Sequence, residues 1–462
     1  MKSIIKSVLL GMTFSSMTLL SGCAALSGVY PAKMKQTQND LADGHIQAAK
    51  TSFIKEMGEK SDSSLYDLEL ARIQQLDGQY QSSKQNYAKV INTIATSQME
   101  AKVRVSSMLE NIGAVLTNDK SLPYSIPDYA MTYLYPYQAL NYLAEDDLSG
   151  ALVAIRQLSN AQYWVYEQKL MAGDLDKKYS KETKKSGIDR DKLGLDKSEK
   201  IKSMFAMSHK ITNSWENGFA LYLSAILYEA FDNNYNNAFV SIKKAKNLLP
   251  DNPYVAKTYE EMENGFNGGS ALKAGYGRLV ILYEQGYVTA KQAFKLPLYL
   301  GSLGLQEVAV PYYPSKYRLL PPIDIDIESN GAKISSAKSA ILVNSTLMAA
   351  KSLTEEYPVI ITREVIRLLT KSLATYEATQ QAGLLGNIAG SVYSFITAEA
   401  DQRSWLLLPN NIQLYETQLP TGDINISIAG RKSITTKIIQ GHTTLIWVVN
   451  IDRFNKVYNL QL

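Results

Sequence analysis

The chain has 462 residues, of which 45% are hydrophobic and 20% are charged. Lys and Arg number 48 against 44 Asp and Glu, so the formal net charge is only +4. This composition is typical of a folded protein of two or three domains and excludes collagen-like or wholly disordered classes. The small positive excess gives no reason to expect a nucleic-acid partner.

The first residues have the pattern of a secretion signal. Lys2 and Lys6 give a short cationic start, and an apolar run follows from Val8 to Leu20. The run is too short to span a bilayer as a helix of the mature protein. We therefore expect residues 1–22 to be a signal peptide that is removed.

A possible lipidation site follows the signal. Cys23 is the only cysteine in the sequence, and Leu20, Ser21 and Gly22 precede it. These four residues resemble the bacterial lipobox, in which the cysteine sulfur receives diacylglycerol after cleavage. A lone cysteine forms no internal disulfide, so lipidation is favoured over a redox, metal-binding or nucleophilic role. The alternative is an ordinary secretion signal beside an incidental cysteine.

The residue after the cysteine bears on localisation. Ala24 stands there rather than Asp, which resembles the pattern of lipoproteins sorted to the outer membrane of Gram-negative cells. Several acyl chains, palmitate among them, anchor a protein stably where one chain would not. We expect an outer-membrane lipoprotein that faces the periplasm, with residues 23–40 as its lipidated tether.

A helical repeat fills residues 41–265. Ile46, Tyr80 and Leu148 start copies of one motif at intervals of 34 and 68 residues, and Tyr235 starts a fourth. The interval of 34 is the tetratricopeptide (TPR) period. A polar turn before each copy and a small residue inside it predict pairs of closely packed antiparallel helices. The small residues expected at these contacts are Ala49, Ser83, Ala151, Ala238 and Ala245.

A charged insertion lengthens the interval before the fourth copy. Residues 173–202 contain ten Lys and Arg and seven Asp and Glu, with few apolar residues. Such a segment buries no core, so a solvated loop or frayed helix at the edge of the repeats is expected. The interleaved acids count against the alternative, a basic docking arm.

The pattern changes after residue 265. Short apolar runs between Gly and Pro predict a β-rich segment over 266–328, a helical segment over 329–403 and a small antiparallel β-sheet over 404–462. The fold class is therefore α+β, with a TPR-like α-helical solenoid followed by a mixed domain that includes a helical hairpin. The first strand is expected at Arg278–Glu284; the glycines before it precede a strand, which excludes a P-loop.

One long stretch in the helical segment carries no charge. It runs from Ala378 to Ala398 and contains the pattern G-x-x-x-G at Gly386–Gly390. Its length alone would allow a transmembrane helix. Its polar side chains and helix-weakening glycines favour a helix packed on the domain core, with contact to a bilayer surface as the alternative.

Catalytic patterns are sparse in this sequence. His45, His209 and His442 lie far apart, which gives little support to a metal site. The adjacent pairs Glu355–Glu356 and Glu260–Glu261 are expected on solvated helix faces. Six tyrosines between Tyr124 and Tyr142 suit either helix packing or a half-buried interface. We expect no catalytic residue, no metal and no cofactor.

A family resemblance rests on several segments together. They are the lipobox, Tyr137–Leu143, Phe219–Ser224, Gly275–Gly277 and Ala398–Trp405. In combination they resemble a family of uncharacterised bacterial TPR-containing lipoproteins, over most of the mature chain. The resemblance implies the TPR fold and carries no catalytic assignment. The sequence departs from the family at Val153–Gln157, where such proteins tend to have an acidic residue.

These observations predict a function in binding rather than catalysis. We expect a scaffold or adaptor whose concave helical groove binds another envelope protein, by fold analogy a cell-wall synthase, a protease or a secretion component. The first alternative is a structural subunit of an outer-membrane assembly or secretion complex. An enzyme acting on peptidoglycan ranks last, because no site for it is evident.

Overall fold

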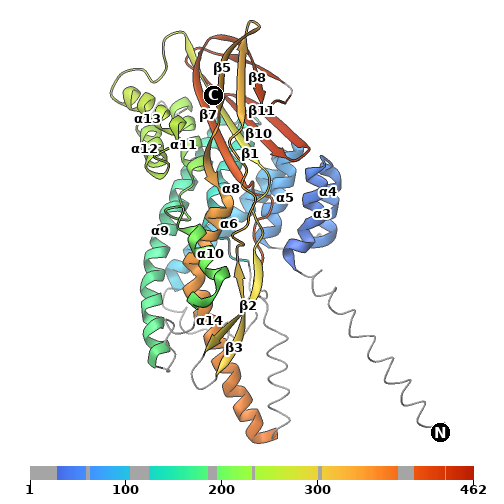
Figure 1. The fold of residues 1–462 in the computed structure, drawn as a ribbon. Helices are drawn as coiled ribbons and strands as arrows, with labels where there is room; N and C mark the ends of the chain where they lie inside the picture. Colours follow the sequence, from blue (N-terminus) through green and yellow to red (C-terminus); the bar gives the residue numbers. More distant parts are fainter. Residues whose placement is uncertain are drawn as a thin grey trace, which may run out of the picture.

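The computed structural model describes residues 29–58, 63–104, 124–185, 195–231, 235–299, 304–382, 400–431 and 433–462. Residues 1–22, expected to be a signal peptide with Leu20, Ser21 and Gly22 in its lipobox, lie outside these residues, as do Cys23 and most of Ala378–Ala398. Within them the fold is α+β, as expected, with helices mostly in the first part of the chain and strands mostly in the second (Figure 1).

Helices make up the described chain as far as residue 266. They are α3 (Tyr30–Ala42), α4 (Ile46–Met57), α5 (Ser64–Asp77), α6 (Tyr80–Arg104), α8 (Asp128–Leu143), α9 (Leu148–Lys185), the 3₁₀ turn η3 (Leu195–Lys197), α10 (Glu199–Ser208), α11 (Gly218–Phe231), α12 (Tyr235–Leu248) and α13 (Pro253–Phe266). One further helix, α14 (Ser345–Ala382), interrupts the strand region. Part of the charged insertion is thus helical, because α9 continues to Lys185.

Four antiparallel helix pairs follow from the repeat pattern. They are α3 with α4, α5 with α6, α8 with α9, and α11 with α12. The second helix of each pair begins at the residue that starts the 34-residue motif, namely Ile46, Tyr80, Leu148 or Tyr235. The start of the motif and the start of the helix therefore coincide in all four copies, although the interval before Tyr235 departs from the 34-residue period.

Individual residues explain where these helices begin and end. Gly78 ends α5 in the left-handed conformation with a φ of 82°, where its N–H donates to the carbonyl oxygens of Gln74 and Gln75. Glycine adopts this conformation without the steric penalty of a Cβ. At the start of α13, Asn252 accepts hydrogen bonds from the N–H groups of Tyr254 and Val255. Pro253 follows it at the first helical position, where a missing N–H is harmless.

The strands form two larger sheets and one separate hairpin. They are β1 (Tyr276–Gln285), β2 (Gln292–Tyr299), β3 (Leu305–Tyr312), β4 (Asp324–Ser329), β5 (Ala332–Lys338), β6 (Ala340–Asn344), β7 (Asn411–Pro420), β8 (Gly422–Ile428), β9 (Ile434–Ile438), β10 (Thr443–Ile451) and β11 (Phe454–Gln461). The strand orders are β11-β10-β1-β7-β6, β5-β4-β8-β9 and β2-β3.

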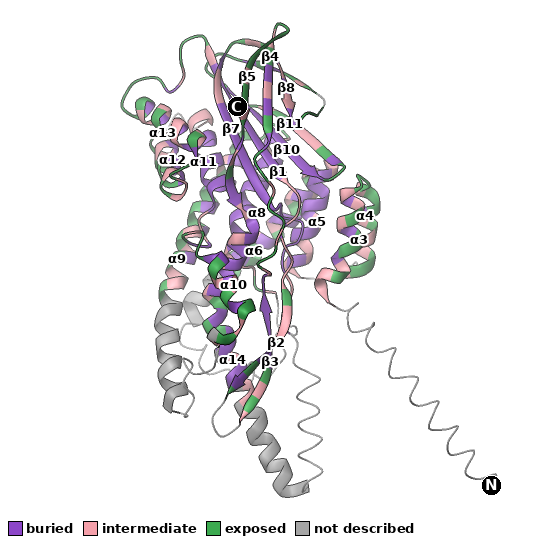
Figure 2. Ribbon diagram, in the orientation of Figure 1, coloured by how far each residue is buried: buried purple, intermediate pink, exposed green. Residues whose placement is uncertain are grey.

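Strand β1 lies at the centre of the five-stranded sheet. It pairs in parallel with β10 and antiparallel with β7. Successive side chains of a strand point to opposite faces of the sheet. Val280 and Leu282 belong to the large core shared with the helices, whereas Leu279 and Ile281 belong to a core shared with the four-stranded sheet. The five-stranded sheet is thus covered on both faces, and Figure 2 shows its middle strands as buried.

The strand region differs from its prediction in three ways. Strands β5 and β6 occupy residues 332–344, inside the segment 329–403 that was expected to be helical. The strands of 404–462 form no separate small sheet, since β7 and β10 flank β1, and β8 pairs with β4. The β1–β10 pair is also parallel rather than antiparallel. Strand pairing between distant segments, which no local pattern encodes, explains these differences.

Helices α9 and α14 are each 38 residues long. Among the residues that the structure describes, no helix is both long and apolar enough to cross a membrane.

Candidate functional site

The small residues singled out from the sequence lie at helix contacts. Ala49, Ser83, Ala151, Ala238 and Ala245 are all fully buried. Ser83 also makes polar contacts, because its Oγ donates to the carbonyl oxygen of Ala71 at 2.7 Å and accepts from Nδ2 of Asn141 at 2.8 Å. These residues serve packing, and the residues with notable chemistry lie elsewhere.

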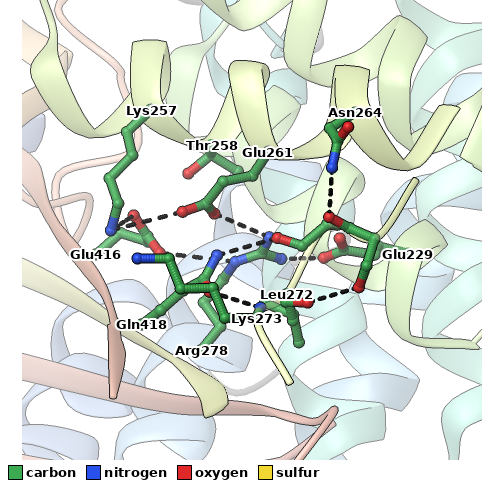
Figure 3. A network of polar contacts seen from close by, with 12 residues as sticks. Glu229, Lys257, Thr258, Glu261, Asn264, Leu272, Lys273, Arg278, Glu416 and Gln418 are labelled. Atoms are coloured by element: carbon green, nitrogen blue, oxygen red, sulfur yellow. Dashed lines mark hydrogen bonds and ion pairs between the residues drawn. The ribbon is translucent and has the colours of Figure 1, made fainter. Parts of the chain in front are cut away.

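The richest polar cluster surrounds Arg278 on β1 (Figure 3). Arg278 is fully buried on the helical face of the sheet. Its Nη1 pairs with Glu229 of α11, and its Nη2 lies 3.1 Å from Oε2 of Glu261 on α13. Glu416 of β7 lies 3.7 Å from its Nε, and Lys257 of α13 lies 3.1 Å from the other oxygen of Glu416. Two helices and two strands thus meet at one guanidinium.

The charges of this cluster depend on one another. Burial disfavours the charge of Arg278, but Glu229, Glu416 and Glu261 together raise its pKa above the ordinary value. Burial raises the pKa of Glu416 to about 7, although Arg278 lowers it. The arginine therefore stays charged, while Glu416 exchanges its proton near neutral pH.

A second buried cluster lies at the other end of β1. Glu284 pairs with Nη2 of Arg72 on α5, and both side chains are 1% exposed. Glu284 also accepts hydrogen bonds from Nε1 of Trp447 at 2.8 Å and from the hydroxyl of Tyr137 at 3.3 Å. The Arg72 guanidinium lies over the Tyr137 ring, 4.2 Å from its centroid. Here α5, α8, β1 and β10 are held together.

A buried carboxylate without a cationic partner in its contacts lies nearby. Glu69 of α5 accepts hydrogen bonds from the N–H groups of Leu406 at 2.6 Å and Leu407 at 3.1 Å, and from the hydroxyl of Tyr30 at 3.1 Å. Burial raises the pKa of Glu69 to about 8, although these three hydrogen bonds lower it. The carboxyl group connects α3 to the segment before β7. Residues 30–40, which were expected to belong to the tether, are therefore part of a helix packed on the body of the protein.

A fourth cluster centres on Lys169 of α9. Its Nζ lies 2.5 Å from Asp128 of α8 and 2.7 Å from Glu355 of α14. Ser214 donates a hydrogen bond to the same carboxylate of Glu355. Glu355, like Glu261, was expected on a solvated face, but tertiary contacts to a buried or half-buried cation hold both acids inside ion-pair clusters.

The tyrosines of α8 pack inside the protein rather than form an interface. Tyr129, Tyr133 and Tyr137 are buried. The ring of Tyr137 meets Trp405 edge-on and stacks with Trp447. The hydroxyl of Tyr133 shares a hydrogen bond with Ser345. The sequence alone left packing and interface open, and the structure favours packing.

The sheet covers the first helix of three pairs. Arg72 of α5, Tyr137 of α8 and Glu229 of α11 all contact side chains of β1 or β10. These inner faces were expected to line a groove for a partner. The chain's own sheet occupies them, so the exposed surface of the repeats lies on the second helices.

Two small cavities among the described residues lie away from Arg278 and Glu284. Two cavities lined by described residues have volumes of about 10 and 20 Å³, which is room for roughly one water molecule. One lies beside Asp128 and Trp215, and the other between Tyr283 and Val457. Neither is lined by Arg278 or Glu284.

The three histidines lie beside different elements and are exposed. His45 precedes α4, His209 follows α10, and His442 precedes β10. In the described part of the chain, no group of three or more His, Cys, Asp or Glu could hold a metal ion. The arrangement of the charged residues in the described part of the chain supports ion pairing and packing.

Sequence reasoning did not single out Arg72, Glu69, Arg278 or Glu284. One signal was present: Arg278 and Glu284 stand at the two ends of an apolar run that reads as a buried strand. A charge at an even spacing in such a strand faces a covered side and requires a partner there.

Comparisons with known proteins add no relative. No protein-family model, no curated protein and no solved structure matches this chain.

Proposed function

We propose that this chain is a lipid-anchored scaffold or adaptor of the bacterial outer membrane that faces the periplasm and binds another envelope protein through its helical repeats. The anchor rests on Cys23 and the lipobox before it. The resemblance to TPR lipoproteins and the four helix pairs support the repeat assignment. The proposal assigns the protein no catalytic activity, and the burial of its charged clusters in ion pairs supports this.

One observation supports the position of the binding surface. Helix α9 exposes Tyr163, Tyr166 and Leu170, which are spaced by three and four residues and therefore share one side of the helix. Aromatic residues on an exposed apolar stripe are enriched in protein interfaces. With the inner helices covered by the sheet, we place the partner on this stripe of α9 rather than in a groove.

Photo-crosslinking in a Gram-negative host tests the binding surface. A benzophenone amino acid replaces Tyr163 in the full chain, with replacement of Ile334 on β5 as the matched exposed control. An envelope protein captured at position 163, absent at position 334 and lost with Tyr166→Asp supports the adaptor. Capture of only the chain itself favours the structural subunit, and no capture at either position contradicts binding through α9.

Membrane fractionation tests the anchor separately. Cys23→Ser leaves the protein without diacylglycerol, so the folded protein should leave the outer-membrane fraction for the soluble periplasm. Full accumulation of the variant in the outer membrane contradicts the assignment of Cys23 as the anchor.

A further inference from the structure

The hairpin of β2 and β3 packs beside α10 and α14, at the end of the molecule opposite β4 and β5 (Figure 1). It pairs with neither of the two larger sheets. Its inward face is buried through Leu296, Leu298, Val308 and Val310. Because this face holds the hairpin in place, the outward face is free to serve another purpose.

The outward face changes character along its length. In the stem, Lys295 of β2 lies 3.9 Å from Glu307 of β3, and both are exposed. At the far end, Tyr299 and Leu305 stand directly opposite each other and are 62% and 69% exposed. A tyrosine beside an aliphatic side chain at the end of a polar stem has the chemistry of a membrane-interface contact, where an apolar body and a polar tip are both accommodated.

The base of the hairpin is held against α3. The hydroxyl of Tyr287, five residues before β2, donates to the carbonyl oxygen of Gln38 at 3.2 Å. Nε2 of Gln38 in turn donates to the carbonyl oxygen of Leu406 at 3.1 Å. Figure 1 shows the first turn of α3 and the β2–β3 hairpin directed to the same end of the molecule, away from β4 and β5. The start of α3 and the hairpin therefore lie toward the same end of the molecule.

The greatest length of the segment from Cys23 to Tyr30 is similar to the length of the β2–β3 hairpin. Tyr30, the first residue of α3, stands seven positions after Cys23, and seven fully extended residues span at most roughly 25 Å. The strands of the hairpin have eight residues each, which corresponds to roughly 26 Å. A bilayer that holds acyl chains on Cys23 therefore lies no farther from the start of α3 than the hairpin is long.

We propose that Tyr299 and Leu305 form a second membrane contact, which rests among the lipid headgroups of the leaflet that holds the anchor. The occupant is a phospholipid surface, and the inference rests on the proposed anchor at Cys23. A single lipid anchor leaves the body free to rotate about the tether. Two contacts on one side of the protein fix its orientation, with β4 and β5 directed away from the membrane.

A fluorophore at the hairpin end tests this contact. Once Cys23 is acylated, a cysteine introduced by Tyr299→Cys is the only free thiol, because the chain has no other cysteine. The full mature protein is labelled with nitrobenzoxadiazole and reconstituted in vesicles of phosphatidylethanolamine and phosphatidylglycerol that contain brominated lipid. Ile334→Cys, exposed on β5 at the opposite end, is the matched control.

The expected result is a blue-shifted emission that brominated lipid quenches at position 299, and no quenching at position 334. Absence of quenching at both positions in the acylated protein overturns the inference. A blue shift that brominated lipid does not quench, with energy transfer between labelled copies, also overturns it and assigns the hairpin to self-association.

The unanchored protein separates this inference from the proposed anchor. Mass spectrometry of the N-terminal peptide reports acylation directly, and its absence contradicts the anchor alone. The membrane contact of the hairpin is then tested on the Cys23→Ala variant. This variant has no anchor and should still bind the same vesicles weakly. Loss of both apolar side chains in Tyr299→Asp with Leu305→Asp should lower that binding roughly tenfold or more. Unchanged vesicle binding of this exposed-site variant overturns the second contact.

Discussion

Arg278 and Glu284 lie six residues apart on the same face of β1, and each meets opposite charges from different helices. Arg278 pairs with Glu229 of α11 and Glu261 of α13, whereas Glu284 pairs with Arg72 of α5. The central strand of the sheet thus carries one buried charge of each sign. These three ion pairs attach α5, α11 and α13 to one strand.

Arg278→Met should destabilise the protein strongly. The substitution keeps an apolar stem but leaves Glu416 and its neighbouring carboxylates without the buried cation, a loss of about 3–5 kcal/mol in the free energy of unfolding. Urea unfolding followed by circular dichroism measures it. The control is Lys338→Met, which removes an exposed pair with Asp324 and should change stability by about 0–1 kcal/mol. Equal effects of the two variants would contradict the buried network.

A double-mutant cycle should show coupling between Arg72 and Glu284. Arg72→Met alone leaves an uncompensated buried carboxylate and should lower the free energy of unfolding by about 3–5 kcal/mol. Adding Glu284→Gln removes that charge and keeps an acceptor for Trp447, so the double variant should recover part of the loss. The expected coupling is about 0.5–3 kcal/mol. Simple additivity of the two single losses would show that the pair contributes no interaction of its own.

Stability should fall as the pH rises from about 5 to about 8. Glu69, with a pKa of about 8, and Glu416, with a pKa of about 7, keep their protons in the folded state after the unfolded chain has lost them. The unfolded state then binds fewer protons, so the stability from each group, fully present at acid pH, is lost as the pH rises, by at most about 1.4 kcal/mol per pH unit.

Glu69→Gln isolates one contribution to this pH dependence. The amide cannot ionise, so the slope of unfolding free energy against pH should be shallower than in the parent protein between about pH 5 and pH 8. Urea midpoints across this range provide the measurement. If the unfolding free energies of the variant and the parent protein had the same slope against pH, the pKa of Glu69 would be the same in the folded and the unfolded state.

Ala238→Trp should disrupt the pair α11–α12. Ala238 is fully buried where these helices meet, and overpacking of such a contact costs about 1–3 kcal/mol or more. Val240→Trp places the same side chain on an exposed position of the same helix and serves as the control. Thermal unfolding should show a lower midpoint for the first variant only, and equal midpoints would count against close packing at Ala238.

Periodicity predicted the helix pairs well because their information is local. A turn, a small residue and an apolar stripe within 34 residues suffice to place both helices, and the starts at Ile46, Tyr80, Leu148 and Tyr235 agree with the pattern. Strands β1 and β10 were also visible, since both read as short apolar runs. By contrast, β5 contains Lys333, Ser335 and Lys338 and is largely exposed, so no apolar alternation marked it.

The sequence could not predict which buried charged residues pair with each other. Arg72 and Glu284 are 212 residues apart, and only the arrangement of helices against the sheet brings them together. Exposed charges vastly outnumber buried ones, so a charged residue on a helix is ordinarily read as solvated. Glu69 shows the same limit, because two of its three partners are backbone N–H groups at Leu406 and Leu407, which no side-chain pattern reveals.

The position of the last strand sets the order in which the fold can be completed during synthesis. In β11, Tyr458 donates to the carbonyl oxygen of Gln75 and Lys456 to that of Leu76. Strand β10 supplies one whole edge of β1. A nascent chain that lacks these strands leaves the end of α5 and the central strand without partners. The native core can therefore form only once residues 443–461 have been synthesised and have left the ribosome.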